Sequence, residues 1–201
     1  MADIVYEYAG GLYLNITNEC PCKCVFCIRD KIETLGTASE MWHEKQPSFE
    51  DIKAAFDGFD KTKFNEVVFC GYGEPTCAFD NLVKTAKYIK EKYGYKIRVN
   101  TNGLGNLINK RDITPELCEI ADMISISLNA PDAERYLKIT RNDFGIDSFD
   151  AMLDFTKKCI DKNADVRMTV VDVIKDDEVE ECRKLAESIG AKFVSRQYTE
   201  E

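Results

Sequence analysis

The chain has 201 residues, of which 44% are hydrophobic and 31% charged, and its formal net charge is −9. This composition is ordinary for a globular protein and argues against disorder. The acidic excess argues against a general affinity for phosphate backbones, although a nucleic-acid substrate bound by a local basic patch stays open. No apolar run approaches the length of a membrane span, and the opening MADIVYEYAGG lacks the basic-then-apolar order of a signal peptide. We therefore expect a cytoplasmic protein with no membrane association.

Strand-like apolar runs and helix-like amphipathic runs alternate along the whole chain. The six expected strands cover residues 12–17, 66–70, 96–100, 123–128, 166–173 and 191–195. The helical stripes between them cover residues 52–59, 82–93, a short run after Thr114, 149–160 and 179–189. Ser48 stands where it would cap the first helix, and Gly94 and Gly190 stand where left-handed caps end the second and the last.

This alternation predicts a parallel sheet, because right-handed crossovers through helices join parallel strands. Two architectures stay open from the pattern alone: a doubly wound open sheet and a partial (β/α)8 barrel. Both place chemistry at the carboxyl ends of the strands. The special residues collect there: CPCKCVFC follows the first strand, GYGEPT the second, TNG the third and NA the fourth.

The stretch CPCKCVFC holds Cys20, Cys22, Cys24 and Cys27. The chain has nine cysteines, an odd number that cannot pair completely, and nothing in the sequence suggests secretion. In a reducing compartment such a cluster more often binds metal. Four thiolates would suit a structural zinc ion or an electron-carrying iron–sulfur cluster, whereas three would leave one iron open for catalysis.

Two motifs favour the open iron. Cys20, Cys24 and Cys27 have the spacing C-x3-C-x2-C, with the aromatic Phe26 before the last cysteine, and GYGEPT follows one strand later. Together they resemble the signatures of the radical S-adenosylmethionine (radical SAM) superfamily, with Tyr72 in place of a glycine. LYLNITNECPCKCVFCIR together with FCGYGEPT is most similar to the small TatD-associated radical SAM branch. The resemblance implies an α/β fold, a partial (β/α)6 TIM-like barrel of parallel strands, as a single domain over residues 1–201 with a core of about 11–197.

The resemblance also implies the chemistry and the cofactors. Cys20, Cys24 and Cys27 would hold a [4Fe–4S] cluster, and S-adenosyl-L-methionine (SAM) would chelate the fourth iron. Reductive cleavage of SAM would generate a 5′-deoxyadenosyl radical that abstracts hydrogen from an unidentified substrate, with flavodoxin or ferredoxin as the kind of reductant. A barrel of six units is open at its side, which suits a protein, a peptide or another large substrate. The alternatives are an iron–sulfur electron carrier and a zinc-stabilised binding module.

The residues implied to contact SAM follow the ends of the strands. The backbone of Gly71, Tyr72 and Gly73 would face its methionyl amino end, where a side chain would obstruct approach, and Glu74 would fix the turn. The candidates for the ribose, carboxylate and adenine are Phe26, Asn100, Asn102, Gly103, Ser127 and Asn129, with weaker ones at Asp172, Val173 and 195–197. An ordinary Gly-Pro turn and simple capping roles for these polar residues are the plain alternatives.

Three residues have no settled role in the sequence. We expect Cys22 not to bind the cluster, although its position between two ligands leaves this open. Cys77 stands just beyond the GEPT turn and is either a buried thiol or a group beside the cluster. His43, the only histidine, is expected in a loop or lid.

Overall fold

The computed structural model describes residues 2–198, so residue 1 and residues 199–201 of the expected domain lie outside the described part. Seven strands form one sheet, and their order across the sheet is their order along the chain. The strands are β1 (Val5–Tyr8), β2 (Gly11–Leu14), β3 (Glu66–Phe69), β4 (Lys96–Thr101), β5 (Met123–Ser127), β6 (Val166–Val171) and β7 (Lys192–Arg196). Strand β1 pairs antiparallel with β2, and every later neighbour is parallel.

The helices are α1 (Phe49–Gly58), α2 (Phe79–Tyr93), α3 (Gly105–Asn109), α4 (Thr114–Ile120), α5 (Ala133–Thr140), α6 (Ser148–Asp161) and α7 (Asp176–Ser188), with short 3₁₀ turns η1 (Ile28–Asp30) and η2 (Pro75–Ala78). Two predicted caps are confirmed. Ser48 and Asp51 form a reciprocal capping box at the start of α1. Gly94 ends α2 with φ of 72°, in the left-handed region. Helices α3 and α5 were not predicted.

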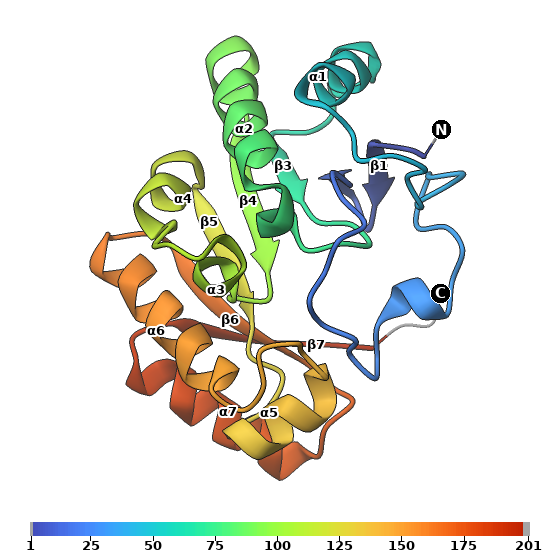
Figure 1. Ribbon diagram of the computed structural model, residues 1–201. Helices are drawn as coiled ribbons and strands as arrows, with labels where there is room; N and C mark the ends of the chain where they lie inside the picture. The colour runs from blue at the N-terminus through green and yellow to red at the C-terminus, as the bar shows by residue number, and fades with distance from the viewer. Residues whose placement is uncertain (1, 199–201) are drawn as a thin grey trace.

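The strand order decides between the two architectures. A doubly wound sheet reverses its strand order at a switch point, whereas six parallel strands in unbroken sequential order, β2 to β7, are the pattern of a barrel. Figure 1 shows the helices outside the curved sheet, with β1 and β7 at its two ends. The expected partial (β/α)6 TIM-like barrel is confirmed. The prediction that residues 1–201 form a single domain with a core of about 11–197 is not tested by this arrangement and stays a prediction.

Strand β1 was not predicted. It joins β2 through Ala9 and Gly10, whose φ values of 45° and 78° are both positive. Positive φ at both central residues is typical of the type I′ hairpin turn, whose twist matches that of the strands. The hairpin therefore adds a short antiparallel strand to the edge of the barrel.

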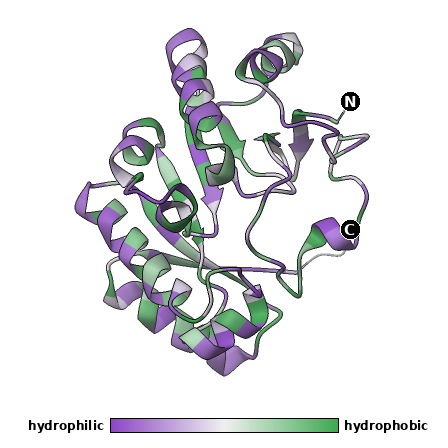
Figure 2. Cartoon of the chain, in the orientation of Figure 1, coloured by the Kyte–Doolittle hydropathy of each residue, from purple (hydrophilic) through white to green (hydrophobic). Residues whose placement is uncertain are grey.

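The main core lies between the sheet and the helices. Alternate residues of the strands, such as Leu12, Val67, Ile97, Ile124 and Met168, are 0% exposed and face the helices. Figure 2 shows that the helices are green on one side and purple on the other, as expected for helices that cover a sheet. Within residues 2–198, no helix is long and apolar enough to cross a membrane.

A second, smaller core lies on the other face of the sheet, beside β1 and β2. It is made of buried residues from the hairpin, the segment after η1 and the turn after β3: Tyr6, Leu35, Ala38, Met41 and Tyr72. The segment 28–47 is therefore packed against the inside of the barrel, next to the loop that carries the cysteines.

Candidate active site

The cysteine loop leaves the carboxyl end of β2 and is held by the structure around it. Cys20, Cys24 and Cys27 are half-buried, and the Cys27 amide donates to the Cys24 carbonyl (3.0 Å) before η1 begins. This local turn keeps the second and third expected ligands on one short stretch of chain.

The end of α5 holds the middle of the same loop. The backbone amides of Lys23 and Val25 donate to the carbonyls of Thr140 (2.9 Å) and Ile139 (3.0 Å). Because peptide hydrogen bonds are short and directional, this pairing fixes the loop conformation between the cysteines. Helix α5, absent from the sequence prediction, is thus part of the site.

The thiol of Cys22 is buried between two of the expected ligands. Contact with the Cys22 thiol lowers the pKa of Cys20 and of Cys24, and the same contacts raise the pKa of Cys22. Burial raises the pKa of Cys27. Metals bind thiolates, and a lower pKa favours the thiolate form. This agrees with a non-ligand role for Cys22, which stays a prediction.

The geometry can be compared with the metal groups expected. A single tetrahedral zinc ion needs its sulfur ligands about 3.8 Å apart around one point. Among the described residues, no group of three His, Cys, Asp or Glu side chains converges in that way. A cubane cluster instead takes each cysteine on a different iron, so its ligands need not converge. Three half-buried cysteines on one loop suit such a cluster.

The two glycines of GYGEPT, Gly71 and Gly73, pack against the segment that leads into the cysteines. A Cβ on Gly71 would lie 2.2 Å from Asn15 Oδ1. A Cβ on Gly73 would lie 2.3 Å from the carbonyl oxygen of Thr17 and 2.8 Å from that of Glu19, just before Cys20. The missing side chains thus make room for the Asn15 side chain and for the backbone of Thr17 and Glu19. The predicted contact of this turn's backbone with SAM stays a prediction.

Tyr72, which departs from the usual glycine, turns its side chain away from the loop into the smaller core. Its hydroxyl donates to the Ile32 carbonyl, and its ring packs edge-on against Trp42 with the centroids 5.2 Å apart. The Tyr72 carbonyl accepts from Arg29 Nη1 (3.3 Å), and the other terminal nitrogen of Arg29 reaches the Cys22 carbonyl (3.3 Å). Tyr72 therefore links the GYGEPT turn, the cysteine loop and segment 28–47.

Glu74 is buried and uses both carboxylate oxygens on the neighbouring strand end. Its Oε1 accepts from the Thr76 amide (3.1 Å) and hydroxyl (2.8 Å) and from Thr101 Oγ1 (2.7 Å), and its Oε2 accepts from the Asn102 amide (2.7 Å). Burial raises its pKa, while these bonds oppose the rise. The Glu74 amide also donates to the Glu19 carbonyl (2.8 Å). Glu74 thus ties the ends of β3 and β4 to the cysteine loop.

Asn102, Ser127 and Asn129 do lie at the carboxyl edge. Asn102 Oδ1 accepts from the Leu104 amide (2.9 Å), and its Nδ2 lies 3.6 Å from Cys22 Sγ, which brings it to the cysteine loop. Ser127 ends β5, and Asn129 follows with φ of 59°, which a non-glycine residue rarely adopts. Within residues 2–198, neither Ser127 nor Asn129 forms a side-chain hydrogen bond to another group. Both remain available to a ligand.

Asp172 and Phe26 are less well placed. Strand β6 ends at Val171, so Asp172 lies in an exposed turn, and its Oδ1 accepts from the Tyr198 amide (2.5 Å). Its placement on a strand was therefore wrong, because the apolar run Val166–Val173 continues past the last strand pair. Phe26 is half-buried and contacts no other ring in the described part of the chain. Its neighbour Val25, 45% exposed, lines a cavity instead.

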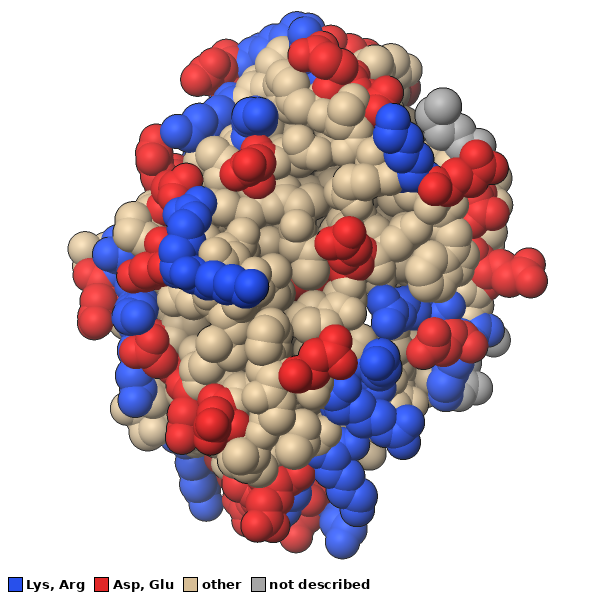
Figure 3. Space-filling view, viewed as in Figure 1, with Lys and Arg blue, Asp and Glu red and all other residues tan. Residues whose placement is uncertain are grey.

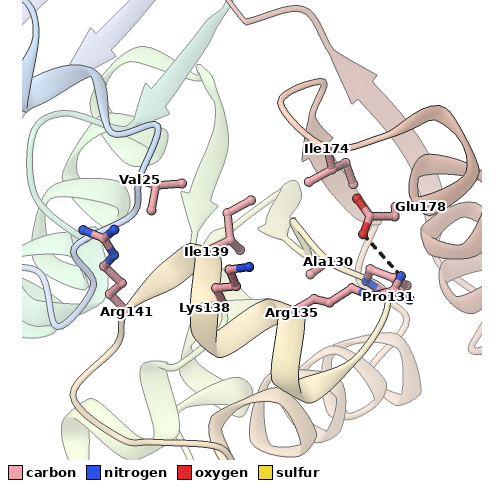
Figure 4. Close-up of a pocket in the computed structure, with 9 residues that line it drawn as sticks. All are labelled: Val25, Ala130, Pro131, Arg135, Lys138, Ile139, Arg141, Ile174 and Glu178. Atoms are coloured by element: carbon pink, nitrogen blue, oxygen red, sulfur yellow. Dashed lines mark ion pairs between the residues drawn. The ribbon is translucent and has the colours of Figure 1, made fainter.

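Two cavities flank the cysteine loop. One, of about 260 Å³, lies between α5 and the ends of β5 and β6. Figure 4 shows Val25, Ile139 and Ile174 around it, with Arg141 beside Val25 and the Arg135–Glu178 ion pair (3.4 Å) at the opposite end. The residues that line it are Val25, Ala130, Pro131, Arg135, Lys138, Ile139, Arg141, Ile174 and Glu178.

Two cations of this cavity are candidate ligands that the sequence prediction missed. In the described part of the chain, Lys138 and Arg141 have no carboxylate partner, unlike Arg135. Figure 3 shows Lys and Arg gathered over this part of the molecule, around α5 and the end of β7, although acidic residues are in excess overall. Their detection required α5, which brings them beside the cysteine loop.

The second cavity, of about 580 Å³, opens on the other side of the loop. Cys20, Cys77, Arg29, Trp42 and Phe144 are among its walls. Burial raises the pKa of the Cys77 thiol, which keeps it neutral. The structure therefore places Cys77 beside Cys20, at the edge of the site.

His43 lies in segment 28–47, away from the strands, but contacts the start of the cysteine loop. Its Nε2 lies 2.9 Å from the Asn15 carbonyl, and its backbone carbonyl accepts from Asn18 Nδ2 (2.7 Å). Burial lowers its pKa. The expected position of His43 in a loop is confirmed, and its hydrogen bonds join segment 28–47 to the start of the cysteine loop.

Comparison with known proteins agrees with this geometry. Residues 14–186 match the model of the family described as "Radical SAM superfamily". The chain is similar to the probable dual-specificity RNA methyltransferase RlmN of Dictyoglomus turgidum, with 28% identity over 147 residues, which are 68% of this chain and 38% of that protein. The chain thus spans well under half the length of this curated relative.

Solved structures share the fold. SuiB of Streptococcus suis has a TM-score of 0.64 at 17% identity, over 90% of this chain and 38% of SuiB. A radical SAM methyltransferase from Sphaerobacter thermophilus has a TM-score of 0.63 at 13% identity, over 96% of this chain and 68% of that protein. The family match covers most of the chain and includes the cysteine loop, the GYGEPT turn and the strand ends. The chain therefore belongs to the radical SAM superfamily.

Proposed function

We propose that this chain is a radical SAM enzyme that abstracts hydrogen from a substrate not yet identified. Its cofactors are those of the superfamily, a [4Fe–4S] cluster and SAM. When bound, the cluster supplies the electron that cleaves SAM to methionine and the 5′-deoxyadenosyl radical. The observation that carries the proposal is the loop with Cys20, Cys24 and Cys27, which are half-buried together at the carboxyl edge of the barrel.

The chain's own residues would bind and position the cofactors. Cys20, Cys24 and Cys27 would bind the irons, and Glu74 would hold the ends of β3 and β4 beside them through its hydrogen bonds. Burial of the loop under segment 28–47 would keep water from the cluster.

SAM would use the edge residues that have free polar groups. Ser127 and Asn129 offer side chains without partners in the described structure, and Asn102 lies next to Cys22. Lys138 and Arg141 offer unpaired positive charge beside apolar walls, which suits a carboxylate next to an adenosyl group. The other proposed members of the site are Phe26, Gly71, Tyr72, Gly73, Glu74 and Asp172. Asp172 is exposed, and Gly71 and Gly73 face residues 15–19.

The finer identity is also proposed. We propose that the chain belongs to the TatD-associated branch, which its motifs resemble and whose name states no reaction. A single-electron reductant such as flavodoxin or ferredoxin would supply the electron. The two ends of the sheet, β1 and β7, do not pair with each other, so the barrel is open at its side. This opening supports a protein, a peptide or another large substrate, which would help to close the site.

An anaerobic reconstitution tests the proposal against an electron carrier and a zinc module. The enzyme should hold about four irons per chain, as one cubane requires, and on reduction with dithionite should convert SAM to 5′-deoxyadenosine and methionine. A colourless protein with zinc would support the binding module. A normal iron content with no effect of SAM would support the electron carrier.

A further inference from the structure

The inner face of the sheet carries three arginines on the side away from the smaller core. Arg98 lies on β4, Arg167 on β6 and Arg196 on β7. Asn100, Ser125 and Arg167 are register partners across β4, β5 and β6, so their side chains share one face. The residues between them, such as Ile124, point to the helices. The three guanidinium groups therefore enter the inside of the barrel.

One contact shows that the arginines converge. Arg196 Nη2 donates to Ser125 Oγ at 2.8 Å, so the side chain crosses β6 to reach the middle of β5. Ser125 is 1% exposed. The Arg196 guanidinium therefore lies over the row formed by Asn100, Ser125 and Arg167.

The positive charge of the group is only partly compensated. Arg98 Nε lies 3.4 Å from Glu66 Oε1. Among the described residues, neither Arg167 nor Arg196 has a carboxylate partner. Lys192, the register partner of Arg167, is by contrast paired with Asp165 at 2.6 Å. In the described part of a chain with net charge −9, Arg167 and Arg196 thus stand on the inner face of the sheet without a carboxylate partner.

This arrangement is unfavourable when empty. Burial lowers the pKa of Arg196, the nearby Cys70 and Tyr13 raise it, and the charges of Arg98 and Arg167 lower it. Like charges in a partly buried space repel more strongly than in water, because the effective dielectric constant is lower. An anion between the guanidinium groups would replace this repulsion with charge-assisted hydrogen bonds.

A buried acceptor points to the same space. Asn100 Oδ1 is buried and has no hydrogen-bond partner in the described structure. Unpaired buried polar atoms are costly and rare in native proteins. Asn100 lies in the row of Ser125 and Arg167, so a ligand hydroxyl or amide beside the anion would satisfy it.

We propose that this inner face binds an anionic oxygen group of the substrate, a phosphate or a carboxylate, through Arg98, Arg167 and Arg196. The inference rests on the proposed function, because it names the substrate class of the same site. Ser125 lies two residues before Ser127 on β5, which places the row roughly 7 Å below the strand ends. The anion would anchor the substrate inside the barrel and leave its reacting carbon near the carboxyl edge.

The test measures anion binding by the reconstituted enzyme with SAM. Inorganic pyrophosphate and citrate are titrated by anaerobic calorimetry, so that a phosphate can be told from a carboxylate. The wild type should bind at least one, and Arg167→Met should weaken that binding about 10- to 100-fold, because a hydrogen bond to a charged group is lost. Arg167→Lys, which keeps the charge, should lose less. Arg183→Met is the matched control, because Arg183 is exposed on α7 and paired with Glu180 at 3.3 Å.

The melting temperature separates binding from a structural role. Without an anion, Arg167→Met should melt at the wild-type temperature or above it, because repulsion is relieved, whereas a structural arginine would lower it. Failure of the wild type to bind either anion would overturn the proposal, as would equal binding by Arg167→Met. An equal loss in Arg183→Met would show general surface attraction and also overturn it. SAM cleavage by the wild type is measured separately, so anion binding without cleavage would reject the proposed function alone.

Discussion

Gly73 is the position where the structure makes the sharpest prediction about cluster assembly. In Gly73→Ala the new Cβ would lie 2.3 Å from the Thr17 carbonyl oxygen and 2.8 Å from that of Glu19, where ordinary contacts begin at 3.4 Å. Both neighbours are backbone atoms, so no rotamer change can relieve the overlap. The cysteine loop would have to move by about 1 Å directly before Cys20.

The cost follows from two effects. Overpacking in a well-packed region costs about 1–3 kcal/mol. Displacement of Glu19 also weakens the hydrogen bond from the Glu74 amide to its carbonyl, worth about 0.5–1.5 kcal/mol. The free energy of unfolding should therefore fall by about 2–4 kcal/mol, a large part of the total for a typical domain. The iron content after reconstitution should fall with it.

Urea unfolding and an iron assay on the purified variant test this reasoning. Gly58→Ala is the matched control, because nothing lies within 4 Å of the Cβ it would add at the end of α1. It should match the wild type in iron content and equal or exceed it in stability. Wild-type stability and iron in Gly73→Ala would refute the packing argument. If only SAM binding were then lost, the glycine would face the ligand after all.

The remaining predictions use the same assays. Cys24→Ser should abolish the brown colour, whereas Cys22→Ser should keep most of the iron, and equal loss in both would make Cys22 a ligand. Glu74→Gln should lower the free energy of unfolding by about 2 kcal/mol, because the amide presents a donor where the carboxylate accepts; an unchanged urea midpoint would contradict this. His43 has a folded pKa below its usual 6.5, so the unfolded chain binds the proton more readily and stability should fall as the pH drops below about 6.5. His43→Gln should remove up to about 1 kcal/mol of that fall between pH 7.5 and 5.5, and an equal fall in both proteins would contradict the assignment.

Much of the fold could be predicted because its signals are local. The cap at Ser48 and the left-handed end at Gly94 depend on a few neighbouring residues, and the strands are short apolar runs between them. Strand β1 was not predicted because it is an edge strand of only four residues, defined by its pairing with β2. Helix α5 was not predicted because it has only eight residues, although Asp132 caps it in the ordinary way.

The site was predictable in its residue types and less so in its geometry. Spacing placed Cys20, Cys24 and Cys27 on one loop, but it could not show that the Cys22 thiol is buried and contacts the thiols of Cys20 and Cys24. The need for glycine at Gly73 was visible, whereas its neighbour, the backbone of residues 17–19, comes from another part of the chain.

The grouping of arginines on the inner face could not be predicted from the sequence for a related reason. Arg98, Arg167 and Arg196 lie far apart in the sequence, and only the strand register brings them onto one face. No local pattern distinguishes them from surface arginines.

Electron paramagnetic resonance of the reduced, anaerobically reconstituted protein with and without SAM tests the central claim most directly. With Cys20, Cys24 and Cys27 as the proposed ligands, one iron of the cluster would stay open, so SAM should change the spectrum by binding to it. Slow formation of 5′-deoxyadenosine and methionine should follow in the same sample. A normal iron content with a spectrum that SAM does not alter, and no cleavage of SAM, would contradict the account.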